Sequence, residues 1–453
     1  MALTIVILAA GQGKRMQSAK PKVLHHLAGH SLLEHVISKA LKFSSEIAPI
    51  VIYGHQGNQV REACGHFAVS WVEQKEQLGT GHALMQAMPQ IALDDQVLVL
   101  YGDVPLIAEE TLKQLIYTTP RHAIGLVTAN LTNPAGYGRI KRDAQNKVIG
   151  IVEEKETNDI ERAIQEINSG IYLIPAAYLQ KWLAKLSKNN SQQEYYLTDI
   201  IPQALAENIA VHTVHPQHAE EIFGVNDRVQ LAALERFYQR NYAEKLMYQG
   251  VTIMDPSRID IRGELHAGQD VVIDIDVIIE GRVTLGDQCV IGAHSILRNA
   301  TLGPRVEVRP HSVIDGAEIG ADCLLGPFAR LRPGTILAAN IHIGNFVEIK
   351  NSEIGVGTKI NHLSYIGDSV VGKKVIVGAG TITCNYDGVN KHRTVIHDDV
   401  FIGSNSQLVA PVTIGLGATI GAGSTITQDA PPHQLTLARA KQLSIEGWKR
   451  KGS

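Results

Sequence analysis

The chain has 453 residues, of which 42 are Lys or Arg and 45 are Asp or Glu, so its formal net charge is −3. This length predicts about two or three domains, and a hydrophobic share of 44% excludes an intrinsically disordered chain. A nearly neutral charge gives no electrostatic reason to expect a nucleic acid or an anionic membrane as a partner.

The N-terminal segment MALTIVILAAG lacks the basic stretch of a signal peptide, and its short β-branched run predicts a first strand. No apolar run approaches the roughly 18 residues that a membrane-spanning helix needs. The four cysteines lie far apart without a C-x-x-C pair, which argues against a zinc site or a disulfide framework. We therefore expect a cytoplasmic protein.

The first half of the chain, up to about residue 223, alternates short apolar runs with amphipathic stretches. Residues 31–41 predict a helix, because Ser31 and Glu34 have the spacing of a capping box ahead of an apolar face. Strand and helix signals that alternate in this way predict an α/β domain with a mostly parallel sheet. The buried strands are predicted at residues 4–8, 49–53, 96–101 and 123–129.

A segment without Gly or Pro, residues 227–248, predicts one long linking helix. We therefore expect a first domain over residues 1–226 and a second over residues 249–453. In the second domain an aliphatic residue returns at every sixth position. Two unbroken series are Ile319, Leu325, Leu331, Leu337, Ile343, Ile349 and Ile396, Ile402, Leu408, Ile414, Ile420, Ile426.

A six-residue period fits neither an α-helix nor an alternating strand. It fits a parallel β-helix, in which each coil has three faces of about six residues. The recurring aliphatic side chains would then point inward and fill a prism of roughly nine coils. The register breaks at CNYDGVNKHRT, residues 384–394. Such an insertion predicts a surface loop, which carries function or is simply tolerated.

The first predicted strand runs into LAAGQGKRM, residues 8–16. Its glycines favour an anion-binding turn, although the pattern matches neither a dinucleotide motif nor a P-loop. Arg15 and Lys22 add positive charge where a transferring phosphoryl group would develop negative charge. Asp103 ends the strand VLVLYGD at the carboxyl edge of the sheet, where it is suited to Mg²⁺ or, alternatively, to a turn.

These motifs, together with PKVL at 21–24, QLGT at 77–80 and GYGR at 136–139, resemble the sugar-1-phosphate nucleotidyltransferases. With NHLSYIGD and TCNYDG in the second half, the whole chain resembles the bacterial family of bifunctional N-acetylglucosamine-1-phosphate uridylyltransferase / glucosamine-1-phosphate N-acetyltransferase enzymes. The resemblance implies a Rossmann-like nucleotidyltransferase domain and a left-handed parallel β-helix of hexapeptide repeats that forms a homotrimer. The general preference for right-handed crossovers would predict the opposite hand, so the hand rests on the resemblance alone.

The resemblance implies a first-domain site for UTP, sugar phosphate and Mg²⁺. Arg15 and Lys22 would neutralise the reacting phosphates, and Asp103 and Asn226 would hold Mg²⁺. On sequence alone, Glu153 is also typical of a solvated surface. The residues expected to bind UTP or UDP-N-acetylglucosamine are Leu8, Ala9, Ala10, Gly11, Lys22, Gln74, Gly79, Thr80, Tyr101, Gly102, Asp103, Gly138, Glu153, Asn168 and Asn226.

In the second domain His362 is expected to be the general base, since N-acetylation removes a proton from an amine and histidine titrates near neutrality. Without the matched motif it would be an ordinary surface histidine, and Arg439 a solvated tail charge. Ile376 stands where the family usually has Asn, so we leave it out of the site. The residues expected to bind glucosamine 1-phosphate are Arg332, Lys350 and Tyr365, and those for acetyl-CoA are Ala379, Asn385, Tyr386, Ser404, Ala422 and Arg439.

Two other functions remain open on the sequence. A single-activity nucleotidyltransferase with a structural or regulatory β-helix predicts no turnover of acetyl-CoA. A scaffold or binding module predicts a bland coil surface, without clustered Arg, Lys, His and Tyr. In every case we expect small molecules as partners and neither nucleic acid nor membrane.

Overall fold

The computed structural model describes residues 2–44 and 47–452. The chain divides into two compact units, Met1–Tyr238 and Gln239–Ser453. Helix α8, Arg228–Tyr248, begins in the first unit and ends in the second, which confirms the long helix predicted from the absence of Gly and Pro. No helix of the described residues is long and apolar enough to cross a membrane.

The first unit is built around a sheet with the strand order β11-β7-β10-β6-β1-β4-β5. The predicted strands are all present, and the sheet is mostly parallel except that β10 runs antiparallel to both of its neighbours. A short antiparallel pair, β8 (Arg139–Arg142) and β9 (Val148–Val152), adjoins β10. The main strands are β1 (Leu3–Leu8), β4 (Ile50–Tyr53), β5 (Ser70–Glu73), β6 (Gln96–Tyr101), β7 (Ile124–Asn130), β10 (Glu166–Pro175) and β11 (Val211–Val214).

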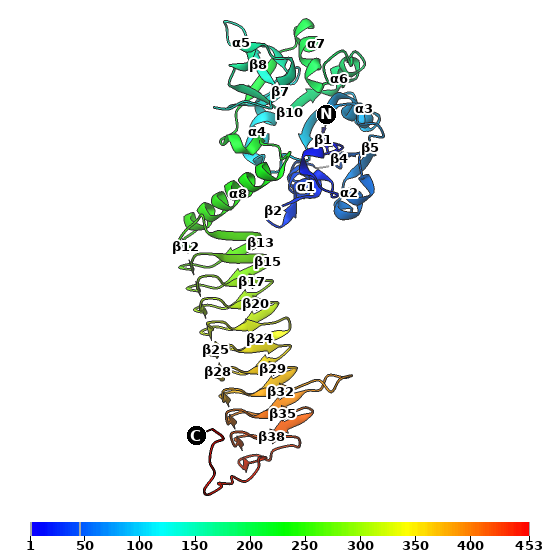
Figure 1. Ribbon diagram of the computed structural model, residues 1–453. Coiled ribbons are helices and arrows are strands. Elements are labelled where there is room, and N and C mark those ends of the chain that lie inside the picture. Colours follow the sequence, from blue (N-terminus) through cyan, green and yellow to red (C-terminus); the bar gives the residue numbers. More distant parts are fainter. Residues whose placement is uncertain (1, 45–46, 453) are drawn as a thin grey trace. The chain divides into compact units, whose positions relative to one another are not determined.

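Helices cover both faces of this sheet (Figure 1). Ile5 and Ile7 of β1 pack with α1 and α4 on one face, whereas Val6 and Leu8 pack with α3 and α6 on the other. The predicted capping box is confirmed, because the Glu34 N–H donates to the Ser31 hydroxyl and the Ser31 N–H donates to the Glu34 carboxylate. The helices are α1 (Leu32–Phe43), α2 (Gly57–Cys64), α3 (Thr80–Ala87), α4 (Glu109–Thr118), α5 (Asp159–Arg162), α6 (Ala176–Leu183) and α7 (Ile200–Ala206).

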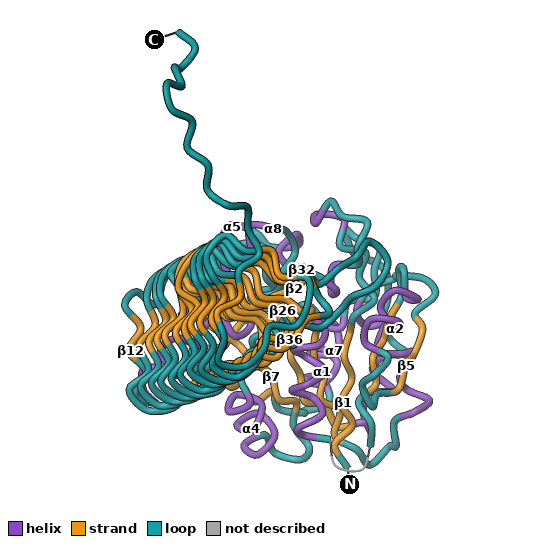
Figure 2. The backbone as a smooth tube through the Cα atoms, turned by 90° about the horizontal axis from the view of Figure 1, so that it is seen from below, coloured by secondary structure: helices purple, strands orange, loops and turns teal. Residues whose placement is uncertain are grey.

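The second unit is a stack of parallel coils, which Figure 2 shows lying almost in register. One face is an 11-stranded sheet, so the stack is longer than the roughly nine coils expected, because coiling begins at Thr252 rather than near Asp260. Its strands are β12 (Thr252–Ile253), β14 (Val272–Ile273), β16 (Val290–Ile291), β19 (Glu307–Val308), β22 (Leu324–Leu325), β25 (His342–Asn345), β28 (Lys359–His362), β31 (Ile376–Val377), β34 (Phe401–Ile402), β37 (Thr419–Ile420) and β39 (Leu435–Thr436).

The other two faces merge into one 17-stranded sheet. Its strands are β13 (Ile259–Ala267), β15 (Val277–Leu285), β17 (Ile296–Arg298), β18 (Thr301–Leu302), β20 (Val313–Asp315), β21 (Ala317–Ile319), β23 (Arg330–Leu331), β24 (Thr335–Leu337), β26 (Glu348–Lys350), β27 (Glu353–Ile354), β29 (Tyr365–Gly367), β30 (Ser369–Val371), β32 (Ile382–Cys384), β33 (Thr394–Ile396), β35 (Gln407–Val409), β36 (Val412–Ile414) and β38 (Thr425–Ile426).

The aliphatic series fills the interior of the coils, as predicted. Leu325, Leu331 and Ile343 have an exposed fraction of 0%. Along the first face Val272 pairs with Val290, which is 18 residues later, whereas Val290 pairs with Glu307, which is 17 residues later. Some coils therefore contain one residue fewer than others. These shorter coils account for the slips in the six-residue register. Because the interior is occupied, the functional groups of this unit lie on its outer surface.

The filled interior leads to a stability prediction. Ile343→Ala removes a side chain of 0% exposure, whereas Ile336→Ala removes one that is 46% exposed. We expect Ile343→Ala to lower the free energy of unfolding by about 2–5 kcal/mol, because it leaves a cavity in the stack. Urea unfolding of the full chain, followed by circular dichroism, measures the change. An equal loss for the Ile336→Ala control would contradict an inward-facing register.

Candidate functional sites

The predicted phosphate-binding turn leaves β1 at the carboxyl edge of the sheet. The Ala9 N–H donates to the Ile52 carbonyl at 2.8 Å, which holds the start of the turn against β4. Gly11 is exposed, and no atom lies within 4 Å of the position of a Cβ there. Gly13 has a φ of 60°, and a Cβ on it would lie 2.6 Å from the Lys22 Cβ. The turn thus presents open backbone at Gly11 and packs closely against Lys22.

Lys22, Asp103 and Asn226 converge at this edge from three separate segments. The Lys22 ammonium forms an ion pair with Asp103 and donates to Asn226 Oδ1 at 3.2 Å. The Val225 N–H donates to the Asp103 carbonyl at 2.9 Å, which fixes the segment that carries Asn226 beside the end of β6. The structure therefore brings together the lysine and both of the predicted metal ligands.

The donor atoms of this cluster suit Mg²⁺. The Asp103 carboxylate and the Asn226 amide both direct an oxygen at a cation, the Lys22 ammonium. Mg²⁺ prefers oxygen ligands and takes few from the protein, since it keeps several waters and binds substrate phosphates. No cluster of three His, Cys, Asp or Glu side chains arranged for a metal occurs in residues 2–44 and 47–452.

Gln74, Gly79 and Thr80, which are among the residues predicted to bind UTP or UDP-N-acetylglucosamine, lie together near the start of α3. Gln74 is buried, and its Nε2 donates to the Gly79 carbonyl at 3.2 Å and lies 3.0 Å from His82 Nδ1. The Thr80 hydroxyl accepts from the Leu197 N–H at 3.1 Å. The contacts of Gln74 Nε2 with Gly79 and His82 fix the orientation of the Gln74 amide. His82, which lies two residues after Thr80 on α3, was not among the predicted residues.

Gly138, Glu153 and Asn168 form a second group of the residues predicted to bind UTP or UDP-N-acetylglucosamine. Burial raises the pKa of the Glu153 carboxyl, and Thr198 donates to that carboxylate at 2.8 Å. Glu153 is therefore an enclosed carboxyl, unlike the solvated surface group that its sequence also allowed. The Asn168 N–H donates to the Gly138 carbonyl at 2.9 Å, which joins these two predicted residues. Burial likewise raises the pKa of Tyr101.

Arg15 differs from the rest of this set. It lies on the short helical turn Lys14–Met16, where its side chain is exposed and has no hydrogen bond or ion pair with any described residue. Lys22 is held by its partners, whereas Arg15 is not, so the structure leaves Arg15 apart from the cluster.

In the second unit, His362 belongs to a column of residues that run along the outside of the coils. Asn345 pairs with His362, and the strand register places Ala379, Ser404 and Ala422 on the three following coils. The Gly423 and Asn405 N–H groups donate to the Ser404 and Ala379 carbonyls, at 2.8 and 2.7 Å. Four of the predicted second-domain residues therefore share one column.

The same column includes the predicted tail residue and one residue that sequence reasoning missed. Arg439 donates to the Ala422 carbonyl at 2.8 Å, so it closes the column at the last coil. Asn345 Oδ1 lies 2.9 Å from His362 Nδ1. An amide oxygen only accepts hydrogen bonds, so His362 Nδ1 carries the proton and donates it to this hydrogen bond, which leaves Nε2 of the neutral ring unprotonated.

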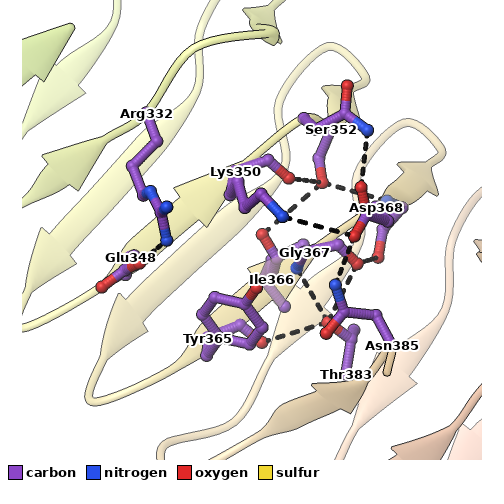
Figure 3. A network of polar contacts seen from close by, with 12 residues as sticks. Arg332, Glu348, Lys350, Ser352, Tyr365, Ile366, Gly367, Asp368, Thr383 and Asn385 are labelled. Carbon is purple, nitrogen blue, oxygen red and sulfur yellow. Dashed lines mark hydrogen bonds and ion pairs between the residues drawn. The ribbon is translucent and has the colours of Figure 1, made fainter. Parts of the chain in front are cut away.

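The predicted sugar-phosphate residues lie around a corner of the coils, shown in Figure 3. Arg332 forms an ion pair with Glu348 at 2.8 Å, and the Lys350 ammonium lies 3.7 Å from the Asp368 carboxylate. The Tyr365 hydroxyl lies over the Cα of Gly367, where a side chain would overlap it. Glu348 and Asp368 were not predicted as members of the site.

Asp368 connects the Lys350 corner with the predicted acetyl-CoA residue Asn385. The Asn385 amide donates to the Asp368 carboxylate (Figure 3). Asn351 donates to the same carboxylate at 2.5 Å. Burial would raise the pKa of Asp368, but the hydrogen bonds from Asn351 and Asn385 and the charge of Lys350 outweigh it and lower the pKa. Asp368 is therefore an anion at neutral pH.

The predicted insertion is a loop that projects from the coils at the level of β32 (Figure 1). Inside it the His392 N–H donates to the Asn385 carbonyl at 2.8 Å, and His392 Nε2 lies 2.7 Å from the Asp387 carboxylate. Tyr386 is 59% exposed, and its hydroxyl donates to the Gly388 carbonyl of the loop. The loop thus begins at Asn385, which is buried beside Asp368, and the next residue, Tyr386, is largely exposed.

The comparisons with known proteins agree with both units. The MobA-like NTP transferase domain matches residues 5–164, the GMPPB C-terminal domain matches residues 261–345, and six bacterial transferase hexapeptide repeats match residues 393–428. Fold and matches together define a transferase in which a nucleotidyltransferase unit is joined to a hexapeptide-repeat β-helix.

Relatives match the chain over nearly its whole length. The bifunctional protein GlmU of Methylococcus capsulatus is 55% identical and covers 99% of this chain and 98% of its own length. Those of Nitrosospira multiformis and of Azoarcus sp. are each 55% identical over 99% of this chain, and 97% and 99% of their own lengths. The chain belongs to the family of the bifunctional protein GlmU, and it is a bifunctional transferase enzyme.

The buried Glu153 carboxyl leads to a pH-dependent prediction. Its raised pKa means that ionising Glu153 lowers the free energy of unfolding. This loss of stability is absent at a pH below the pKa that Glu153 has in the unfolded chain. It is complete at a pH above the pKa that Glu153 has in the folded chain. Glu153→Gln keeps an acceptor for Thr198 without the charge. We expect the Tm of this variant, measured relative to the Tm of the parent chain at the same pH, to increase as the pH rises from about 4 to 8. A Tm difference that does not change with pH would contradict a buried ionisable Glu153.

Proposed function

We propose that the chain makes UDP-N-acetylglucosamine from glucosamine 1-phosphate in two reactions. The second unit transfers the acetyl group of acetyl-CoA to the sugar amine, and the first unit then transfers the uridylyl group of UTP to N-acetylglucosamine 1-phosphate, releasing pyrophosphate. The domains are residues 1–226 and 249–453, joined by the helix at 227–248. This proposal rests on one observation: the Lys22–Asp103–Asn226 cluster and the column that contains His362, each made by residues far apart in sequence, occur in one chain of the GlmU family.

The proposed uridylyl transfer needs no covalent intermediate on the enzyme. A phosphate oxygen of N-acetylglucosamine 1-phosphate attacks the α-phosphorus of UTP in line, and the bond to pyrophosphate breaks. The exposed backbone at Gly11 and the Lys22 ammonium bind the nucleotide phosphates, while Gln74 and Thr80 bind uracil. Asp103 and Asn226 would hold Mg²⁺, which would neutralise phosphate charge when bound. Arg15, whose side chain forms no hydrogen bond or ion pair with residues 2–44 and 47–452, binds the same phosphates.

The remaining predicted residues of the first unit shape this site. Glu153, Asn168 and Gly138 bind the sugar, and Tyr101 lies beneath it. Leu8, Ala9, Ala10 and Gly102 form the floor of the site at the carboxyl edge of the sheet, where their small or buried side chains leave the backbone accessible.

In the proposed acetyl transfer, Arg332 and Lys350 bind the phosphate of glucosamine 1-phosphate through charge-assisted hydrogen bonds, and Tyr365 contacts the sugar. The sugar amine attacks the thioester carbonyl, a C–N bond forms and the C–S bond breaks. His362 Nε2 takes the proton that the amine loses and passes it to the departing thiolate. Asn385 and Tyr386 lie at the reacting groups, and Ala379, Ser404, Ala422 and Arg439 line the acetyl-CoA along the column.

A reciprocal pair of variants tests this division of labour. His362→Ala is expected to lower the release of thiol from acetyl-CoA, with glucosamine 1-phosphate as acceptor, by about 10²–10⁴-fold, because the general base is lost. Pyrophosphate release from UTP is expected to persist. Asp103→Ala is expected to abolish the Mg²⁺-dependent pyrophosphate release and to leave thiol release unchanged. Both reactions are measured on the full chain.

Matched controls are His397→Ala on the β-helix and Glu62→Ala on α2, since both side chains are exposed and lie outside the proposed sites. Both controls are expected to keep both activities. Loss of both reactions in either test variant would contradict independent sites. A chain that releases pyrophosphate but never thiol would instead be a single-activity nucleotidyltransferase.

We further propose that the enzyme acts as a homotrimer in the cytoplasm. The threefold number comes from the family resemblance, and two observations support an assembly in a reducing compartment. Apolar side chains lie exposed beside the His362 column, namely Phe328, Phe346 and Leu363, and the first two stack with ring centres 5.3 Å apart. The four cysteines are free thiols.

The trimer is tested by the solution mass of the purified protein. Sedimentation equilibrium is expected to give three times the 49.2 kDa mass of one chain. Because each exposed apolar side chain would be covered by a neighbouring subunit, Phe346→Glu is expected to shift the mass toward one chain. A parent protein that sediments as a single chain with full acetyl transfer would refute the proposal.

A further inference from the structure

Asp368 is the centre of a hydrogen-bonded column that the proposed mechanism does not use. It stands at the corner between β29 and β30, where its φ is 49°. Asn351 and Asn385 occupy the matching corner position on the preceding and the following coil, 17 residues away in each direction. The column therefore has an amide, a carboxylate and an amide on three successive coils, and Figure 3 shows its members Asp368 and Asn385.

The carboxylate determines which way the Asn385 amide faces. An ionised carboxylate only accepts hydrogen bonds, so the Asn385 NH₂ group must point toward Asp368 and the Oδ1 atom must point away. Asn385 is buried, and its Oδ1 has no hydrogen-bond partner among the described residues. An amide held in one orientation by a charge thus keeps one free acceptor beside the proposed acetyl-transfer site.

Lys350 completes the arrangement. Its ammonium lies 3.7 Å from the Asp368 carboxylate, and its main chain pairs with Gly367, the residue before Asp368. The Asp368 carboxylate therefore faces two groups. One is the Lys350 ammonium, which is proposed to bind the sugar phosphate, and the other is the Asn385 amide, which is proposed to lie beside the sugar amine. The two groups are proposed to contact adjacent substituents of one substrate, the phosphate on C1 and the amine on C2, so their separation matters to the reaction.

We infer that Asp368 is a positioning residue for the acetyl transfer, which orients the Asn385 amide so that its oxygen accepts an N–H of the attacking sugar amine, and holds the Lys350 ammonium at the phosphate. The inference rests on the proposed acetyl transfer. The amine nitrogen gains positive charge as its bond to the thioester carbon forms, and a fixed acceptor stabilises that charge until His362 takes the proton. Asp368 itself touches neither substrate.

The first test is Asp368→Asn in the full chain. A neutral amide accepts and donates, so it no longer fixes the orientation of Asn385. We expect kcat for thiol release to fall on the order of tenfold to a hundredfold, less than the roughly 10²–10³ for losing a direct transition-state hydrogen bond. KM for acetyl-CoA and pyrophosphate release from UTP are expected to stay unchanged. Asp322→Asn is the matched control, because Asp322 is an exposed corner carboxylate with a φ of 60° that pairs with Arg305.

The second test separates positioning from mere folding. Asn385→Asp places two carboxylates together and is expected to lose at least as much activity as Asp368→Asn. In the double variant, Asp368→Asn with Asn385→Asp, the amide at position 368 donates to the carboxylate at position 385, whose second oxygen still accepts. We expect this exchange to recover several-fold of the lost kcat, and we expect Asp368→Asn and the double variant to keep a Tm near that of the parent.

Parent-like kcat in Asp368→Asn, or a double variant no more active than either single variant, would overturn the inference. An equal loss in Asp322→Asn would also overturn it. If the parent chain releases no thiol from acetyl-CoA, the proposed acetyl transfer itself fails. That result differs from the failure of the inference, in which the parent chain is active and the variants do not discriminate.

Discussion

The filled interior of the β-helix determines where its chemistry lies. One branched aliphatic side chain per face and coil occupies the prism, so inward positions are unavailable to a substrate. Each outward-facing position recurs once in every coil, and neighbouring coils are about 4.8 Å apart. Residues 17 or 18 positions apart in sequence thus become direct neighbours, as Asn345 and His362 do. The repeat that stabilises the stack also assembles the site.

The first unit reaches the same result by a different route. Alternate residues of β1 are buried on opposite faces of the sheet, beneath helices on both sides. Because both faces are covered, the carboxyl edge of the sheet is where backbone and polar side chains become accessible. Lys22, Asp103 and Asn226 meet at that edge, each from a different segment.

Each unit contains a lysine, an aspartate and an asparagine in contact, but the asparagine faces opposite ways. Asn226 turns its oxygen toward the Lys22 ammonium, whereas Asn385 turns its NH₂ group toward the Asp368 carboxylate. In the first unit two oxygens therefore surround a position occupied by positive charge, which suits a metal ion. In the second unit the amide oxygen is left over as an acceptor. The same three residue types give different chemistry because the amide has a donor end and an acceptor end.

The sequence by itself determined the two units, the first strands, the Ser31 capping box and the inward aliphatic series, because all of these depend on local spacing. It also supplied His362 and Asp103 through motifs. Only the tertiary structure decided that β10 runs antiparallel, that Arg15 lies apart, and that Asn345 and Asp368 contact the predicted residues. Those contacts depend on whether each coil has 17 or 18 residues, and one residue changes which side chains are neighbours. A search for polar residues 17 apart would have found Asn351, Asp368 and Asn385, but their amide orientations follow from charge in the folded chain.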